Sequence, residues 1–204
     1  MLDTRFFKFL TKSNKAEFFI KTNRKMKLTL ESFELANRPP GKSMSARMQD
    51  FDTSAQLQEA TLQVIATAKR GIAIYSRDLE HSLYAQTEIV EALKQFAIKS
   101  RGGLARILVQ DTMAARSQPH PLLGLSQRLS SVFQFRTPID PEDLQYPSAF
   151  IASDRDAYCF RLLDGRFEGD WSPSLPARNK QLVEHFSRVW ERSRPCTEFR
   201  ALGL

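Results

Sequence analysis

The sequence predicts an α/β domain with a mixed, mostly parallel sheet and helices on both of its faces. Short β-rich runs alternate with helical patterns through residues 51–204 of the 204-residue chain. The run at 104–109 is apolar apart from Arg106, as in a strand that is covered on both sides. The order of strand, helix and strand between residues 72 and 109 implies a right-handed crossover to a parallel neighbour.

Composition narrows the function classes. A hydrophobic content of 42% in 204 residues is enough to form a core. No apolar run approaches the roughly 18 residues of a membrane span, and the N-terminus does not have the pattern of a signal peptide, so we expect a cytoplasmic protein. Cys159 and Cys196 lack metal-ligand spacing, which predicts reduced thiols. No His, Cys or carboxylate group has the spacing of a metal site, and no glycine-rich phosphate loop occurs, so we predict neither metal nor cofactor.

The positive charge is concentrated at the N-terminus. Of the net charge of +7, residues 1–50 contribute +6 (11 Lys/Arg against 5 Asp/Glu) and residues 51–204 contribute +1 (19 against 18). We therefore predict a basic, loosely ordered arm and linker over 1–50 and a domain over 51–204. Within the arm, the spacing indicates a short amphipathic helix near residues 2–10 and a strand at 26–30. Two interpretations remain open: the arm is simply solvated, or it attracts nucleic acid or an anionic membrane surface.

The first half of the domain contains two helices and two strands. A hydroxyl residue, Thr53 or Ser54, begins a helix that carries apolar residues on one face. A strand follows at 72–75, and Thr87 is expected to cap the second helix. That helix ends at the Ser-Arg-Gly-Gly turn before the strand at 104–109.

The second half repeats the pattern and ends in a hairpin and a helix. A helical pattern at 122–129 precedes a short strand at 133–136. Two further runs, 150–153 and 157–162, flank a turn-forming Asp-Arg-Asp and predict an antiparallel hairpin. The final helix has a strongly apolar face over residues 182–190.

Three local patterns occur in the order found in the phospholipase D-like superfamily. A glycine-turned strand at 101–111 ends in an acidic residue, the hairpin around Asp154 lies where the superfamily has its HxKxxxxD strand, and residues 178–181 lie where it often has an NxE element. Residues 53–195 thus resemble one repeat of that fold. They are also similar to an uncharacterised bacterial domain that follows N-acetyltransferase domains, although the acetyltransferase's glycine-rich loop is missing here. This second resemblance implies an accessory role in an acyltransferase system.

The resembling strand lacks the superfamily's reactive groups. The histidine position holds Pro147, the lysine position holds Ala149, and Gln181 replaces the acid of the NxE element. In the enzymes that the chain resembles, the histidine attacks phosphorus and the lysine neutralises phosphoryl oxygens. We therefore expect a non-catalytic binding or regulatory module, for a protein partner or an anionic ligand. Active relatives join two repeats, so the resemblance also implies a homodimer.

Five residues are candidates for binding an anionic ligand: Arg77, Arg136, Asp154, Arg161 and Asn179. Arginines near the carboxyl ends of strands could hold an oxyanion, because ligands bind at that edge of open α/β sheets. Alternatively, the three arginines pair with Asp78, Asp111 and Asp154 in a structural network. In that case Asp154 also stabilises the hairpin turn by accepting backbone N–H bonds, and Asn179 caps the last helix. The histidines at 81, 120 and 185 lie in different elements and are expected at the surface.

Overall fold

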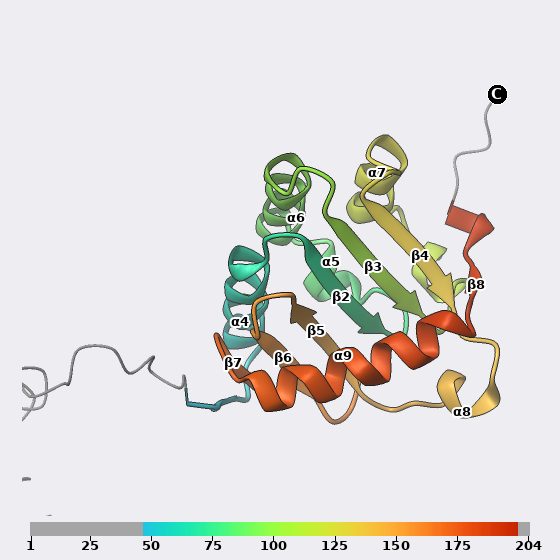
Figure 1. The fold of residues 1–204 in the computed structure, drawn as a ribbon. Coiled ribbons are helices and arrows are strands. Elements are labelled where there is room, and N and C mark those ends of the chain that lie inside the picture. Colours follow the sequence, from blue (N-terminus) through green and yellow to red (C-terminus); the bar gives the residue numbers. More distant parts are fainter. Residues whose placement is uncertain (1–46, 200–204) are drawn as a thin grey trace, which may run out of the picture. The chain divides into compact units, whose positions relative to one another are not determined.

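A single eight-stranded mixed sheet organises the part of the chain that the structure describes, residues 47–199 of a computed structural model (Figure 1). The strand order is β1-β7-β6-β5-β2-β3-β4-β8. The three central strands β2, β3 and β4 run parallel, and the other neighbours pair antiparallel. The strands are β1 (Gln49–Phe51), β2 (Gly71–Ser76), β3 (Leu104–Val109), β4 (Phe133–Thr137), β5 (Ala149–Ser153), β6 (Tyr158–Arg161), β7 (Gly169–Ser172) and β8 (Arg194–Pro195).

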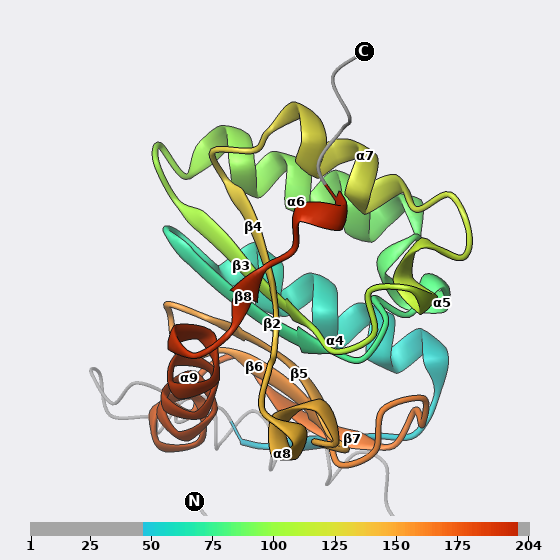
Figure 2. The same cartoon turned by 90° about the vertical axis from the view of Figure 1, so that its right-hand side faces the viewer.

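Helices cover both faces of this sheet, as predicted. In Figure 2, α4, α6 and α7 lie on one face and α9 lies on the other. The helices are α4 (Ser54–Thr67), α5 (His81–Tyr84), α6 (Thr87–Lys99), α7 (Pro121–Arg128), α8 (Pro141–Leu144) and α9 (Pro176–Glu191), with 3-10 turns at Ala114–Arg116 and Thr197–Phe199. No helix within residues 47–199 is long and apolar enough to cross a membrane.

Two cores, one on each face, hold the layers together. On the α4 side, Val64, Ile74 and Ile107 are fully buried. On the α9 side, Tyr75 and Phe186 are fully buried. Burying a side chain of this size contributes roughly 1.5–3 kcal/mol.

The start of α4 shows how local sequence sets an element. Thr53 Oγ1 accepts a hydrogen bond from the Gln56 backbone N–H at 3.3 Å, and Gln56 Oε1 accepts one from the Thr53 N–H at 3.3 Å. This capping box satisfies two backbone donors at the helix start, and such caps are worth about 1 kcal/mol.

The main elements agree with the sequence predictions, and the short ones do not. The predicted helices and the 150–162 hairpin are present, and both cysteines are free and buried. Gln86, not Thr87, holds the cap position of α6. The sequence analysis missed α5, α8 and the strands β1, β7 and β8, each with six or fewer residues. The expected helix and strand of the arm, at residues 2–10 and 26–30, lie outside the described residues.

Candidate functional site

The positions that the sequence resemblance assigns to the superfamily's histidine and lysine, Pro147 and Ala149, lie at the carboxyl edge of the parallel strands. β5 runs antiparallel to β2, with Phe150 opposite Tyr75, so β5 begins where β2 ends. Pro147 and Ala149 therefore lie at this edge. Asp154 follows the other end of β5, and its N–H donates to Gly71 O at the start of β2. Two of the three motif positions thus share an edge, while Asp154 lies at the amino edge.

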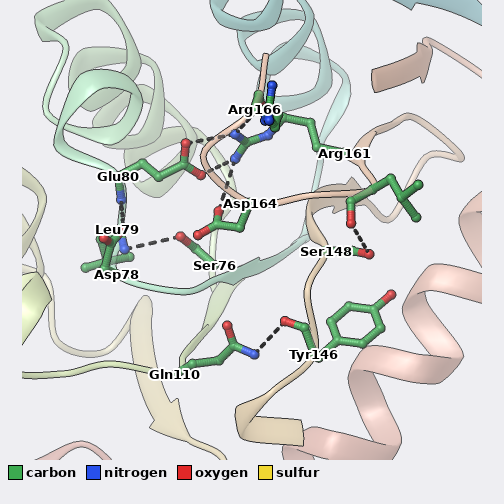
Figure 3. A network of polar contacts seen from close by, with 11 residues as sticks. Ser76, Asp78, Leu79, Glu80, Gln110, Tyr146, Ser148, Arg161, Asp164 and Arg166 are labelled. Carbon is green, nitrogen blue, oxygen red and sulfur yellow. Dashed lines mark hydrogen bonds and ion pairs between the residues drawn. The ribbon is translucent and has the colours of Figure 1, made fainter. Parts of the chain in front are cut away.

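A buried ion network of Arg161, Glu80 and Asp164 occupies this edge (Figure 3). Arg161 lies directly opposite Ala149 in the β5–β6 pair. Its Nη1 donates to Glu80 Oε2 at 2.8 Å and to Arg166 O at 2.9 Å, and its Nη2 also contacts Glu80. Asp164 Oδ1 lies 3.5 Å from the same Nη2. The side chains of Arg161 and Glu80 are 3% and 9% exposed, so the bidentate pair is largely screened from water.

The network places two carboxylates against one guanidinium. Burial, together with the neighbouring Glu80, raises the pKa of Asp164 to about 7, although Arg161 opposes this shift. Near neutral pH the site therefore binds a proton that an exposed aspartate would release. The Arg161 guanidinium is thus engaged within the protein, by Glu80, Asp164 and the backbone oxygen of Arg166.

A strained loop after β2 delivers Glu80 to this network. Leu79 has a φ of 62° and is fully buried, which is rare for a bulky side chain. Ser76 Oγ accepts from the Leu79 N–H at 3.1 Å, and Asp78 Oδ1 accepts from the Glu80 N–H at 2.9 Å. His120 Nε2 lies 3.0 Å from Leu79 O. Several contacts thus hold a backbone conformation that would otherwise be unfavourable.

The five predicted ligand residues do not form one site. Arg77 is exposed at the carboxyl edge, and Arg161 is enclosed in the ion network. Arg136 lies on the α9 side, where its guanidinium packs 4.8 Å from the centre of the Trp190 ring and donates to Trp190 O at 2.8 Å. The expected convergence at the carboxyl edge is therefore not observed.

Asp154 and Asn179 bind backbone groups instead. Asp154 accepts hydrogen bonds from the N–H groups of Lys69 and Arg70 at 2.9 and 3.0 Å, which ties the β5–β6 turn to the loop before β2. Asn179 lies inside α9, and Nδ2 donates to Ser153 O and Ala157 O. The expected cap role of Asn179 is wrong, because Leu175 occupies the cap position of α9.

The expected pairing of arginines with aspartates is also wrong. Asp78 Oδ1 accepts from the Glu80 N–H, and Asp111 Oδ1 accepts from the N–H groups of Met113 and Ala114. Aspartates directly after strands cap the next turn, because their short side chains reach nearby backbone donors. The actual carboxylate partners of Arg161 are Glu80 and Asp164.

Two histidines differ from the surface positions predicted for them. His120 is buried, caps α7 through Nδ1, and lies with its ring centre 5.5 Å from that of the exposed His81. His185 packs its ring against Tyr146 and Tyr75 at centre distances of 4.5 and 5.9 Å. Burial lowers the pKa of both His120 and His185, so both are neutral at pH 7.

Apolar side chains are unusually exposed around this edge. Of the nine large exposed hydrophobic residues in the described chain, six lie in the loops and in the short helix α8 at the carboxyl edge: Met113, Ile139, Leu144, Leu162, Leu163 and Phe167. Ile139 and Leu144 also line a cleft of about 620 Å³, together with Arg77, Asp111 and Arg194. The exposure of these apolar side chains was not predicted from the sequence. An apolar residue in a loop can be either buried against other elements or exposed to solvent, and the sequence pattern does not distinguish the two.

Solved structures place this architecture among phospholipase D-like folds. Nuc, a phospholipase D family member from Salmonella typhimurium, matches 74% of this chain and 97% of its own at 15% identity, with a TM-score of 0.52. NucT from Helicobacter pylori matches 74% and 99% at 11% identity, with a TM-score of 0.53. TrmBL2, an archaeal chromatin protein described with a novel mode of DNA binding, matches 89% of this chain at 14% identity, with a TM-score of 0.55. The match covers 66% of TrmBL2, slightly under two thirds of its length.

Residues 53–202 match the family described as Domain of unknown function (DUF7931), and the chain belongs to that family. A comparison with curated proteins gives no significant match. At these low identities, the likeness to the solved structures shows the fold alone. The function of the site must therefore be argued from its own residues.

Proposed function

We propose that this protein is a non-catalytic phospholipase D-like domain that binds a protein partner through the carboxyl edge of its sheet. One observation carries the proposal: the edge exposes six large apolar side chains. The resemblance adds that Pro147 and Ala149 stand where the superfamily has its histidine and lysine. Clustered exposed apolar side chains commonly mark protein interfaces.

The charge of the edge also favours a protein over a small anion. Its loops at 77–80, 110–116, 138–147 and 162–168 carry eight carboxylates and three arginines, and Arg161, Arg192 and Arg194, which contact these loops or line the same cleft, reduce the sum from −5 to −2. Arg77 and Arg194 are the features that favour an anionic ligand, since both line the cleft. Arg194 is already paired with Glu198 at 2.7 Å, and Asp111 lies on the same cleft. A partner with apolar anchors and basic residues complements this edge better.

The absence of catalysis is tested with a generic phosphodiester. Purified protein incubated with bis-p-nitrophenyl phosphate is expected to release no nitrophenol above the buffer rate. The matched variant is Asp164→Asn, which keeps the shape of the side chain but cannot ionise. If the wild-type protein hydrolyses the phosphodiester and the Asp164→Asn variant does not, the non-catalytic proposal is refuted.

The docking surface is tested by placing charge on it. Leu163→Asp with Phe167→Asp should abolish retention of the partner by immobilised protein in lysate from its source cells. The control is Ile98→Asp, which alters an apolar residue on α6 that is 61% exposed and lies away from the edge. Proteins retained equally by both variants would contradict docking at this edge. Light scattering shows whether the partner is a second copy.

A second candidate function is nucleic-acid binding. The basic arm, with 11 Lys/Arg against 5 Asp/Glu in residues 1–50, supports it, as does the likeness to the DNA-binding TrmBL2. Neutralising phosphates with lysine and arginine predicts affinity that falls steeply with salt. If the affinity of the protein for a DNA duplex is the same at 50 and at 200 mM salt, this second candidate function is excluded. The accessory role in an acyltransferase system stays a prediction, which a longer form of the chain would test.

A further inference from the structure

We propose that the amino edge of the sheet is a contact surface for the phosphate backbone of a nucleic acid. The surface, here called the amino-edge patch, consists of Lys69, Arg70, Lys99, Arg101 and Arg155. It rests on the nucleic-acid function proposed above, but it places the contact on the folded domain and not only on the arm.

Hydrogen bonds show that the three loops of the patch are neighbours. The Asp154 carboxylate accepts from the N–H groups of Lys69 and Arg70, which joins the β5–β6 turn to the α4–β2 loop. The Leu104 N–H donates to Arg70 O at 2.9 Å, which joins the α4–β2 loop to the α6–β3 loop. The five cations therefore belong to one continuous stretch of surface.

The patch is positive and solvated. The segments 68–70, 99–103 and 154–156 contain five cations and two carboxylates, which gives +3. All five cationic residues are exposed. One of the carboxylates, Asp154, has both oxygens bonded to backbone N–H groups. The opposite edge totals −2 when Arg161, Arg192 and Arg194 are counted with its loops, so the domain presents oppositely charged ends, and the positive end would attract a polyanion.

The backbone at Arg101 supports a role for its charge. Arg101 has a φ of 42°, a conformation that favours glycine, and two glycines follow it directly. The chain thus has an arginine at the tip of this turn where a glycine would fit with less strain. The dipoles of α4 and α6 account for cations near the ends of these helices. They do not account for Arg155 in a strand turn or for the strain at Arg101.

A groove runs from the patch between the two helices. It has a volume of about 510 Å³, with Lys69 and Lys99 on its lining and with Ile65 and Phe96 among its apolar residues. The same lining includes Ser100, whose buried Oγ has no hydrogen-bond partner in the structure. Lysines beside a concave surface can follow a phosphate chain, and this binding is independent of base sequence.

The test measures binding of the full-length protein to a fluorescent DNA duplex by anisotropy between 50 and 200 mM salt. The patch variant combines Lys69→Gln, Arg70→Gln and Arg101→Gly; the glycine removes the cation and suits the positive φ. The control combines Arg116→Gln, Arg166→Gln and Arg188→Gln, which remove the same charge from exposed positions elsewhere. A third variant neutralises Lys21, Arg24 and Lys25 in the arm.

At 50 mM salt, we expect the patch variant to lose affinity for the duplex by at least tenfold. The control variant, with the same charge removed elsewhere on the domain, should show no such loss. The slope of the logarithm of the binding constant against the logarithm of the salt concentration should become shallower by about two to three. Three cations are removed, and each phosphate contact contributes about 0.9 to this slope. Equal losses in the patch and control variants would overturn the inference. Loss confined to the arm variant would overturn it too, while leaving the second candidate function intact.

Two further outcomes separate the proposals. Wild-type protein that binds no duplex would remove both the patch and the second candidate function. Anionic vesicles of phosphatidylglycerol serve as the competing probe. If the patch variant no longer binds these vesicles but binds DNA as tightly as the wild-type protein, the patch contacts a membrane surface and the inference is refuted. Urea unfolding of each variant confirms that the domain is folded.

Discussion

Replacing Arg161 with leucine is the most direct perturbation of the carboxyl edge. The substitution leaves Glu80 and Asp164 buried without their guanidinium. Removing one partner of a buried ion pair typically costs about 3–5 kcal/mol, because the remaining charge is neither solvated nor paired. We expect the free energy of unfolding, measured with urea at pH 8, to fall by this amount.

The pH dependence identifies the cause of that loss. The folded-state pKa of Asp164, about 7, is above the ordinary value of 3.8, so the folded state binds more protons than the unfolded state between these values. Ionising Asp164 therefore destabilises the fold as pH rises, by up to about 4 kcal/mol at 1.36 kcal/mol per pKa unit. Without Arg161 the pKa rises further. The Arg161→Leu variant should consequently lose less stability at pH 5, where Asp164 is already protonated, than at pH 8.

A matched control and a rescue complete the assay. Arg166→Leu removes an exposed arginine whose contact with Arg161 uses only its backbone oxygen, so the change should stay within about 0.5 kcal/mol. Adding Glu80→Leu and Asp164→Asn to Arg161→Leu should restore much of the stability, since no charge is then buried. An equal loss at pH 5 and pH 8 would refute the electrostatic reasoning and assign the effect to packing.

The remaining predictions concern other contacts of the fold. Asp154→Ala should cost about 1–3 kcal/mol in urea unfolding, because two backbone N–H groups lose a charged acceptor, and a change below 0.5 kcal/mol would argue against this role. Asn179→Leu should cost a similar amount, since two carbonyls lose their donor; an unchanged midpoint would contradict it. Burial lowers the pKa of His120 in the folded state, so stability should be lost as pH falls below about 6.5, and His120→Asn should reduce that loss. The homodimer implied by the two-repeat enzymes should appear in light scattering at micromolar concentration, and a monomer would exclude it.

The sequence predicted the long elements of the fold because they have strong local signals. Leu182 and Phe186 share one face of α9, and Thr53 caps α4 as its hydroxyl suggested. The edge strands β1, β7 and β8 are two to four residues long. Such segments are too short for a periodic pattern, and pairing with a neighbour determines whether they form.

The candidate site was harder to predict, because its contacts are distant in sequence. Glu80 and Arg161 are 81 residues apart, and neither position has a local signal for its partner. The strained backbone at Leu79 that positions Glu80 depends on contacts from Ser76 and His120, which sequence patterns do not show. Arg77 follows β2, whereas Arg136 and Arg161 lie near the ends of β4 and β6, and the side chains have different surroundings once the sheet is formed.

The register between Ala149 and Arg161 bears on whether phospholipase chemistry could be engineered into this domain. Ala149 is 2% exposed and lies directly opposite Arg161 in the β5–β6 pair, so Ala149→Lys would force a second cation into the space of a methyl group. Removing Arg161 to make room would in turn leave Glu80 and Asp164 buried without a guanidinium to pair with. Pro147→His and Ala149→Lys are therefore insufficient as a pair, because the ion network of Arg161, Glu80 and Asp164 would have to change with them.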